Sequence, residues 1–233
     1  MTEEEWLGTT DPRSLLYFLQ NRGSHRKFRR FAVECCRQIW HQLDENGRTL
    51  LVLAERYGDG DGVSKSTLRT ARHRLRTLNW PFNSAAWHAA HAVRAAAWFR
   101  NDEPHGSYSW HKAADCAGHV TRAYLPDAVR GQDWRVFSAT PEWGASRAAQ
   151  SRLIREVFRN PFRQITDDSR WLTPTVVALA QGIYERAAFD RLPILADALQ
   201  DAGCDNADVL AHCRGDAPHV RGCWAVDLIL GKS

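Results

Sequence analysis

The sequence predicts an all-α fold, a compact domain of roughly nine to ten short helices, and three observations support this prediction. Apolar residues recur at helical spacing along most of the 233 residues. Residues that start helices precede these stretches, and glycine or proline follows them. No segment has the alternation, the density of β-branched residues and the paired turns expected of a β-hairpin. A helical-repeat-like arrangement stays open, because "WLGTTDPRSLLYFLQ" and "WLTPTVVALAQGIY" share a Trp-Leu start ahead of a helix.

The first half of the chain carries most of the longer predicted helices. A short helix begins at Pro12, behind the capping residue Asp11, and ends before Gly23. Apolar residues at helical spacing predict a second helix over about 25–43, with the arginines at positions 29, 30 and 37 off its apolar stripe. Further helices are expected at about 47–57, 64–78, 83–100 and 108–124.

A break in the helical pattern separates these helices from the second half. Residues 125–143 contain Pro126, Gly131 and Pro141, which makes them the best candidate for an internal boundary. Beyond it, helices are expected at about 145–158, from Pro174 with Thr173 as cap, and at about 191–202, 206–213 and 219–230. We therefore expect one domain over 1–233 with a weak boundary near 125–143; the alternative is two helical halves, 1–124 and 144–233.

Composition and the N-terminal residues predict a cytoplasmic protein. Hydrophobic residues make up 44% and charged residues 25% of the chain, an ordinary globular balance. No apolar run approaches the roughly 20 residues that span a membrane, and "MTEEEW" lacks the plan of a signal peptide. In the cytoplasm thiols stay reduced, so the six cysteines are expected to be packed, metal-bound or reactive rather than disulfide-linked.

The basic residues are mostly arginine, and tryptophan is abundant. Four lysines leave 27 of the 31 basic residues as arginine, which indicates either recognition of phosphates and carboxylates or the codon bias of a GC-rich genome. Ten tryptophans are spread along the chain. Such large rings can anchor short helices to each other, and any that stay exposed would mark a surface for a protein partner.

Two stretches of the sequence resemble a known family. The C-terminal "FDRLPILADALQDAGCDNADVLAHCR" and "HVRGCWAVDLILGK", together with the N-terminal "RKFRRFAVECCRQIW", are similar to blocks shared by a bacterial family of uncharacterised proteins. The resemblance covers about residues 3–57 and 153–232 and implies one coherent unit. It implies no chemistry, because no function is assigned to that family.

The C-terminal stretch also concentrates potential metal ligands. Cys204, Cys213, His219 and Cys223 follow the spacing C-x8-C-x5-H-x3-C. Three thiolates and an imidazole could close a tetrahedral zinc site, and His212 could replace its neighbour Cys213. The alternative is that these cysteines pack in the core, since free cysteine is a common buried residue and Cys223 precedes the apolar "WAVDLIL".

A second constellation lies in the middle of the chain. His88 and His91 are three residues apart on one predicted helix, and Cys116 and His119 are three apart on the next. Residues at i and i+3 share a helix face, so two antiparallel helices could present all four side chains to a zinc ion, or to iron with a carboxylate such as Asp115. Alanine-rich packing with histidines at its margin is the alternative.

One helix carries a stripe of positive charge. Lys65, Arg69, Arg72 and Arg76 recur at i, i+4, i+7 and i+11. Such a helix can lie along a phosphate backbone, although no recognisable nucleic-acid-binding motif surrounds it and a solvated face is the alternative.

The sequence predicts function only by class. It contains no phosphate-binding loop, nucleophile elbow, dinucleotide fingerprint or H-E-x-x-H motif. The favoured hypothesis is a non-enzymatic protein-interaction or adaptor module without a cofactor. The alternatives are a zinc-binding protein that uses the C-terminal cysteines and histidines, and a nucleic-acid-binding protein that uses the arginine-rich helix.

Overall fold

The all-α prediction is confirmed. The structure is a computed structural model that describes residues 1–76, 80–98, 107–165, 169–216 and 218–232. Within these ranges the chain is 71% helical, without strands, and ten of its 14 α-helices have seven or more residues. The helices are α1 (Glu3–Gly8), α2 (Pro12–Leu19), α3 (His25–Gln38), α4 (Glu45–Asp59), α5 (Lys65–Arg76), α6 (Ala85–Ala96), α7 (Ser107–Tyr124), α8 (Asp127–Arg130), α9 (Trp134–Phe137), α10 (Pro141–Val157), α11 (Pro174–Arg186), α12 (Leu192–Asp201), α13 (Ala207–Arg214) and α14 (Trp224–Ile229), with 3₁₀ turns at Trp40–Gln42, Ser169–Trp171 and Phe189–Arg191.

The chain forms two compact units, Met1–Ile154 and Arg155–Ser233. The division falls inside α10, so the last residues of that helix belong to the C-terminal unit. No helix in the described ranges is both long enough and apolar enough to cross a membrane.

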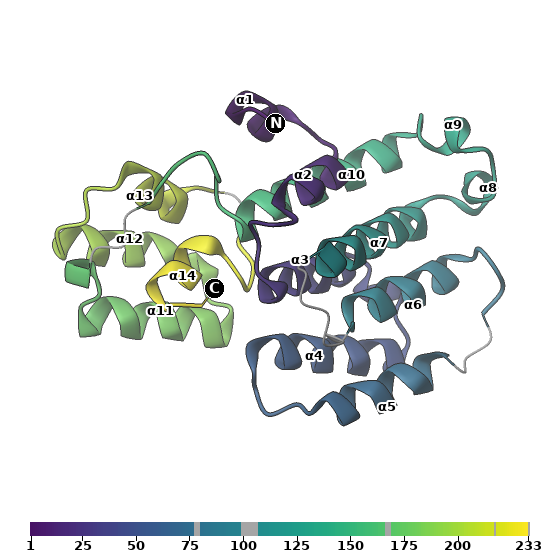
Figure 1. The fold of residues 1–233 in the computed structure, drawn as a ribbon, viewed down its shortest axis with the longest axis horizontal. Coiled ribbons are helices and arrows are strands. Elements are labelled where there is room, and N and C mark those ends of the chain that lie inside the picture. Colours follow the sequence, from purple (N-terminus) through teal and green to yellow (C-terminus); the bar gives the residue numbers. More distant parts are fainter. Residues whose placement is uncertain (77–79, 99–106, 166–168, 217, 233) are drawn as a thin grey trace. The chain divides into compact units, whose positions relative to one another are not determined.

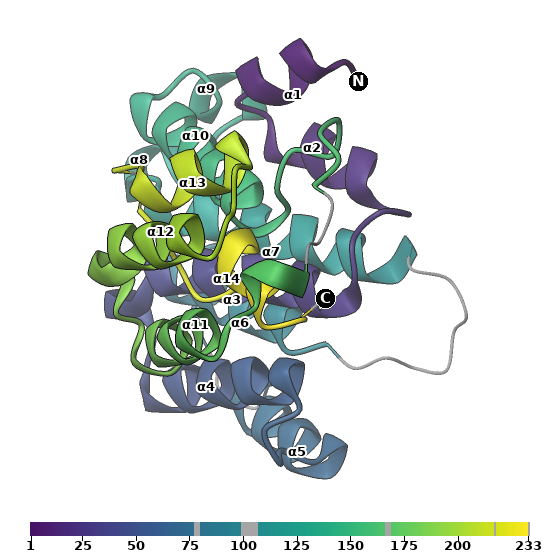
Figure 2. The same ribbon diagram turned by 90° about the vertical axis from the view of Figure 1, so that its left-hand side faces the viewer.

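Helix α3 is the central element of the N-terminal unit. It begins where the Ser24 hydroxyl accepts a hydrogen bond from the backbone N–H of Lys27, at 3.2 Å. Helices α4, α6 and α7 all pack against it, and α5 lies alongside α4 in both views of the ribbon (Figures 1 and 2). With neighbours on several sides, α3 buries a much wider face than its apolar stripe alone predicts.

This environment changes the role of two arginines that the sequence places off the stripe. Arg29 is buried, and its guanidinium donates to the carbonyl oxygens of Ala96 at 3.0 Å and Trp98 at 2.7 Å. It also lies over the rings of Tyr57 and Trp98. Arg30 is buried as well, in ion pairs with α4. These arginines join helices of the core and contact little solvent.

The C-terminal unit is built around a core cluster of its own. Helices α11, α12, α13 and α14 supply most of its apolar side chains. The hydroxyl of Thr173 caps α11 ahead of Pro174, as the sequence predicts, and the side chain of Asn206 caps α13.

The last helix is shorter than its sequence pattern predicts. Instead of running over about 219–230, α14 starts at Trp224. Gly222 precedes it with φ of 93°, a left-handed conformation that interrupts the helix and that glycine adopts without strain. His219 and Cys223 therefore lie in and at the end of a loop.

The end of α11 provides a test of backbone strain. Its C-cap residue, Ala187, is exposed and left-handed, with φ of 52°. Because this conformation costs an L-residue about 1–2 kcal/mol, we expect Ala187→Gly to raise the free energy of unfolding of the C-terminal unit by about 0.5–1 kcal/mol in urea denaturation. The neighbouring Ala188→Gly, at φ of −86°, should lower it instead. Stabilisation by both substitutions, or by neither, would contradict this account.

Candidate functional site

Four potential metal ligands converge in the C-terminal unit. One ligand atom from each of Glu156, His212, His219 and Cys223 lies within 4.8 Å of those of the other three. Glu156 is in the last turn of α10, His212 in α13, His219 in the following loop, and Cys223 directly ahead of α14. The tertiary structure thus brings together residues that are far apart in the sequence.

The distances between these ligand atoms resemble the edges of a metal tetrahedron. Glu156 spans both imidazoles, with Oε1 at 3.0 Å from His219 Nδ1 and Oε2 at 3.5 Å from His212 Nε2. Cys223 Sγ lies 3.1 Å from His212 Nε2. A tetrahedral zinc ion with ligands at 2.0–2.3 Å would separate such atoms by about 3.3–3.6 Å. These three distances are within a few tenths of an ångström of that range. The four ligand atoms as a set lie within 4.8 Å of one another, so zinc binding would draw the more distant ones closer by up to about 1 Å.

The protonation of the free site follows from burial and from the charge of Glu156. Burial lowers the pKa of His219, but its hydrogen bond to Glu156 and the negative charge there outweigh burial, so the pKa lies above its usual value. Burial raises the pKa of Cys223 well above its usual value, and Glu156 adds to the effect. The thiol is therefore protonated until a cation replaces its proton.

The charges of these side chains suit a divalent cation. A thiolate and a carboxylate carry two negative charges, which a zinc ion would neutralise within the site. Cys223 is 0% and Glu156 6% exposed, so this balance matters. Thiolate and imidazole ligands together favour zinc over magnesium or calcium, which prefer oxygen ligands.

The site shares only two residues with the set expected from sequence. His219 and Cys223 belong to it, and His212 takes part as the proposed replacement for Cys213. Cys204 and Cys213 lie outside the converging group, buried in the apolar core cluster of the same unit. The reason is helical geometry: neighbours on α13 point about 100° apart, so Cys213 faces the core while His212 faces the site.

Glu156 was not among the ligands predicted from the sequence. It is far from the C-terminal histidines in sequence, and a glutamate in an arginine-containing helix is typical of a solvated face. We find no signal in the single sequence that singles it out.

A catalytic cysteine–histidine pair does not fit this arrangement. His212 Nε2 approaches both the thiol of Cys223 and the carboxylate of Glu156, whereas a catalytic histidine uses one ring nitrogen for the nucleophile and the other for the orienting group. Cys223 is also fully buried with a raised pKa, the opposite of an activated thiol.

In the N-terminal unit, three of the four residues of the second predicted constellation lie together. His88 Nδ1 is 3.0 Å from His119 Nδ1, and the ring of His91 is 5.2 Å from that of His119. Cys116 is separate from them. Its thiol donates to the carbonyl of Ala32 at 3.3 Å, and its sulfur lies 3.5 Å from that of Cys36 on α3. Helix α7 packs against both α3 and α6, and Cys116 faces the first while His119 faces the second.

Hydrogen bonds fix the protons of these histidines. The side-chain amide of Asn83 donates to the carbonyl of Arg130, so its oxygen is the acceptor for Nε2–H of His88 at 2.7 Å. Nδ1 of His88 then accepts from Nδ1–H of His119. The ring of His88 is neutral in this arrangement.

The histidine pair predicts acid sensitivity of the N-terminal unit. Burial, together with His119, Arg122, Arg130 and His91, lowers the pKa of His88 to about 3, and burial lowers that of His119 to about 4. Below about pH 6.5 the unfolded chain takes up these protons while the folded protein does not. The free energy of unfolding therefore falls as the pH is lowered, until folded His119 binds its proton at about pH 4 and folded His88 at about pH 3.

The measurement is hydrogen exchange of α6 and α7 amides at pH 7 and pH 5. We expect the opening free energy to fall by up to about 1.4 kcal/mol per pH unit for each histidine as the pH is lowered. A His88→Gln variant keeps an acceptor for His119 without a titrating ring. Its opening free energy should therefore fall less between pH 7 and pH 5. Equal opening free energies at the two pH values would rule out this role of the pair.

The predicted basic stripe is only partly exposed. Arg69 is exposed, whereas Lys65 and Arg72 are half-buried and Arg72 donates to the carbonyl of Arg94 on α6 at 3.2 Å. The side chain of Arg76 lies outside the described part of the chain. Arg72 thus helps to pack α5 on α6, which leaves fewer charges for a nucleic-acid backbone than the sequence indicates.

Comparisons with protein families, with curated proteins and with solved structures gave no significant match to this chain. Functional inference therefore depends on the geometry of the sites above.

Proposed function

We propose that this chain is a zinc-binding protein in which Glu156, His212, His219 and Cys223 hold one structural zinc ion. The observation that carries the proposal is the convergence of four ligand atoms of suitable chemistry within 4.8 Å of one another. Two of the ligands are anionic when bound, so the complex with zinc would be neutral.

A structural ion suits this site better than a catalytic one. Catalytic zinc keeps a coordination position open for water or substrate, whereas four protein ligands close the shell. The four ligands come from α10, α13, the loop after α13 and the start of α14. Zinc would therefore cross-link the segments around the core of a short unit, where a small core alone gives limited stability.

The test is the metal content of the full chain purified without chelators. We expect about one equivalent of zinc per chain, and, after its removal, rebinding of one zinc ion in competition with a chromophoric chelator. Less than about a tenth of an equivalent, together with no rebinding, would exclude the proposal.

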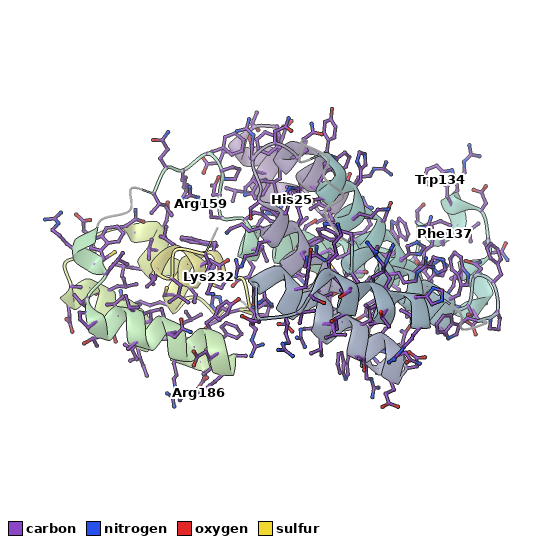
Figure 3. All side chains as sticks on the ribbon, turned by 60° about the horizontal axis from the view of Figure 1, so that its bottom comes forward. His25, Trp134, Phe137, Arg159, Arg186 and Lys232 are labelled. Atoms are coloured by element: carbon purple, nitrogen blue, oxygen red, sulfur yellow. The ribbon has the colours of Figure 1, made fainter. Side chains whose placement is uncertain are left out.

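Protein interaction is a second candidate function, favoured by apolar side chains at one end of the N-terminal unit. Trp134 on α9 is 63% exposed and extends outward from its helix (Figure 3). Phe82 is 84% exposed, and its neighbour Asn83 donates to the carbonyl of Arg130 on α8, which brings that loop next to this end. Exposed aromatic residues of this kind are enriched in protein interfaces.

Site-specific photo-crosslinking in cells tests this candidate. A photoreactive phenylalanine analogue in place of Trp134 should give a discrete adduct that is lost when Phe82 is also changed to serine. The same analogue in place of the exposed Thr70 on α5 is the control. Absence of an adduct specific to position 134 would remove the candidate.

A further inference from the structure

We infer that Trp224 limits the zinc affinity of the proposed site, because its indole N–H holds His212 in the tautomer that cannot ligate through Nε2. The inference rests on the proposed zinc site, and it assigns a role to a residue that is not itself a ligand. It predicts that removing a buried hydrogen bond makes zinc binding tighter.

The indole fixes the proton of His212. Trp224 Nε1 lies 3.1 Å from His212 Nδ1, and an indole N–H can only donate. Nδ1 must therefore be the acceptor, and the single proton of the neutral ring is on Nε2. That nitrogen faces two acceptors, Cys223 Sγ at 3.1 Å and Glu156 Oε2 at 3.5 Å.

His219 shows the opposite and more usual arrangement. Its Nε2 lies 3.4 Å from the carbonyl oxygen of Gly215, which can only accept, so Nε2 keeps its proton. Nδ1, which faces Glu156, is then free to bind zinc once it loses its own proton. Ligating histidines generally donate their other ring N–H in this way.

Zinc at His212 Nε2 requires the ring proton to move to Nδ1. There it would point at the indole N–H of Trp224, and two donors cannot share a hydrogen bond. No proton is gained or lost by the ring, but the bond to Trp224 has to be given up.

The indole has little room to adapt. Trp224 is buried within the core cluster of the unit, with its ring 4.6 Å from that of His212. The zinc-bound site would leave a buried N–H without its present acceptor, and this penalty lowers the affinity.

The experiment compares zinc affinities of the full chain and two variants by competition with a chromophoric chelator. We expect Trp224→Phe to bind zinc about five- to tenfold more tightly than the unsubstituted chain, since it lacks the N–H but keeps an aromatic ring. Trp171→Phe is the matched control. Trp171 is buried in the same core cluster, with 8% of its surface exposed against 7% for Trp224, and both substitutions remove the same side-chain volume. Its affinity should stay within about twofold of the unsubstituted chain.

Nuclear magnetic resonance of the imidazole nitrogens gives a readout that needs no variant. His212 should carry its proton on Nε2 in the zinc-free chain and on Nδ1 in the zinc-bound chain, and the indole N–H signal of Trp224 should shift between the two.

The outcomes separate this inference from the proposed function. Stoichiometric zinc binding that is unchanged or weakened in Trp224→Phe, or a zinc-free His212 protonated on Nδ1, overturns the role of Trp224 and leaves the zinc site. Failure of both the unsubstituted chain and Trp224→Phe to bind zinc overturns both.

Discussion

Cys223→Ala should lower the zinc affinity of the chain by about 1,000-fold and remove the stabilisation of its C-terminal unit by zinc. The physical reason is that the substitution removes the only thiolate of the group and half of its negative charge. A ligand that binds only the folded state at about 1,000 times its dissociation constant adds roughly 4 kcal/mol of stability. A chelator should therefore destabilise the unsubstituted C-terminal unit by several kcal/mol and leave Cys223→Ala nearly unaffected.

Cys204→Ala is the matched control for this experiment. Cys204 is also a buried thiol of the C-terminal unit, but it lies outside the converging group. We expect Cys204→Ala to retain one equivalent of zinc despite the loss of packing. Equal loss of zinc from both variants would indicate the ligand set of the sequence pattern, and retention of zinc by Cys223→Ala would contradict the site described here.

Arg30→Ala should destabilise the N-terminal unit by about 1.5–3 kcal/mol, because two buried carboxylates lose their shared partner. Glu55 keeps its ion pair with Arg37, and Asp59 keeps its ion pair with Arg26, so neither charge is left without a counterion. Arg30 is 1% exposed. Its guanidinium donates to Glu55 at 2.7 Å and, through Nε, to Asp59 at 3.1 Å. Both acids lie on α4, so the loss of these ion pairs weakens the contact of α3 with α4. We expect faster hydrogen exchange of the α3 and α4 amides and a lower urea midpoint.

Arg56→Ala provides the comparison on the same helix. Arg56 is exposed and donates to the backbone carbonyl of Asp61 at 3.1 Å. Its removal should cost less than about 0.5 kcal/mol, as is usual for surface substitutions. If Arg30→Ala were within 1 kcal/mol of the unsubstituted chain, the buried ion pairs would not hold α3 to α4 as described.

Helix positions were predictable where local chemistry decides them. Asp11 ahead of Pro12 and Thr173 ahead of Pro174 start their helices as predicted, because a cap bonds to an N–H two or three residues away. The pattern was less informative near residue 219, where a left-handed glycine interrupts an otherwise periodic apolar stretch.

Burial of charge was not predictable from periodicity. Arg29 and Arg30 lie off the apolar stripe of α3, yet both are buried, since acceptors from α4 and from the end of α6 reach them. An apolar stripe identifies the face that prefers a core, but it does not say how many helices surround the element.

The sequence by itself determined the helical class, most helix starts, and the local concentration of cysteine and histidine near the C-terminus. Only the tertiary structure decided which of those side chains meet: it brought Glu156 to His212, His219 and Cys223, sent Cys204 and Cys213 into the core, and placed Trp224 against His212. The physical reason is range. Capping and periodicity act over a few residues, whereas the direction of each side chain depends on how helices distant in sequence pack together.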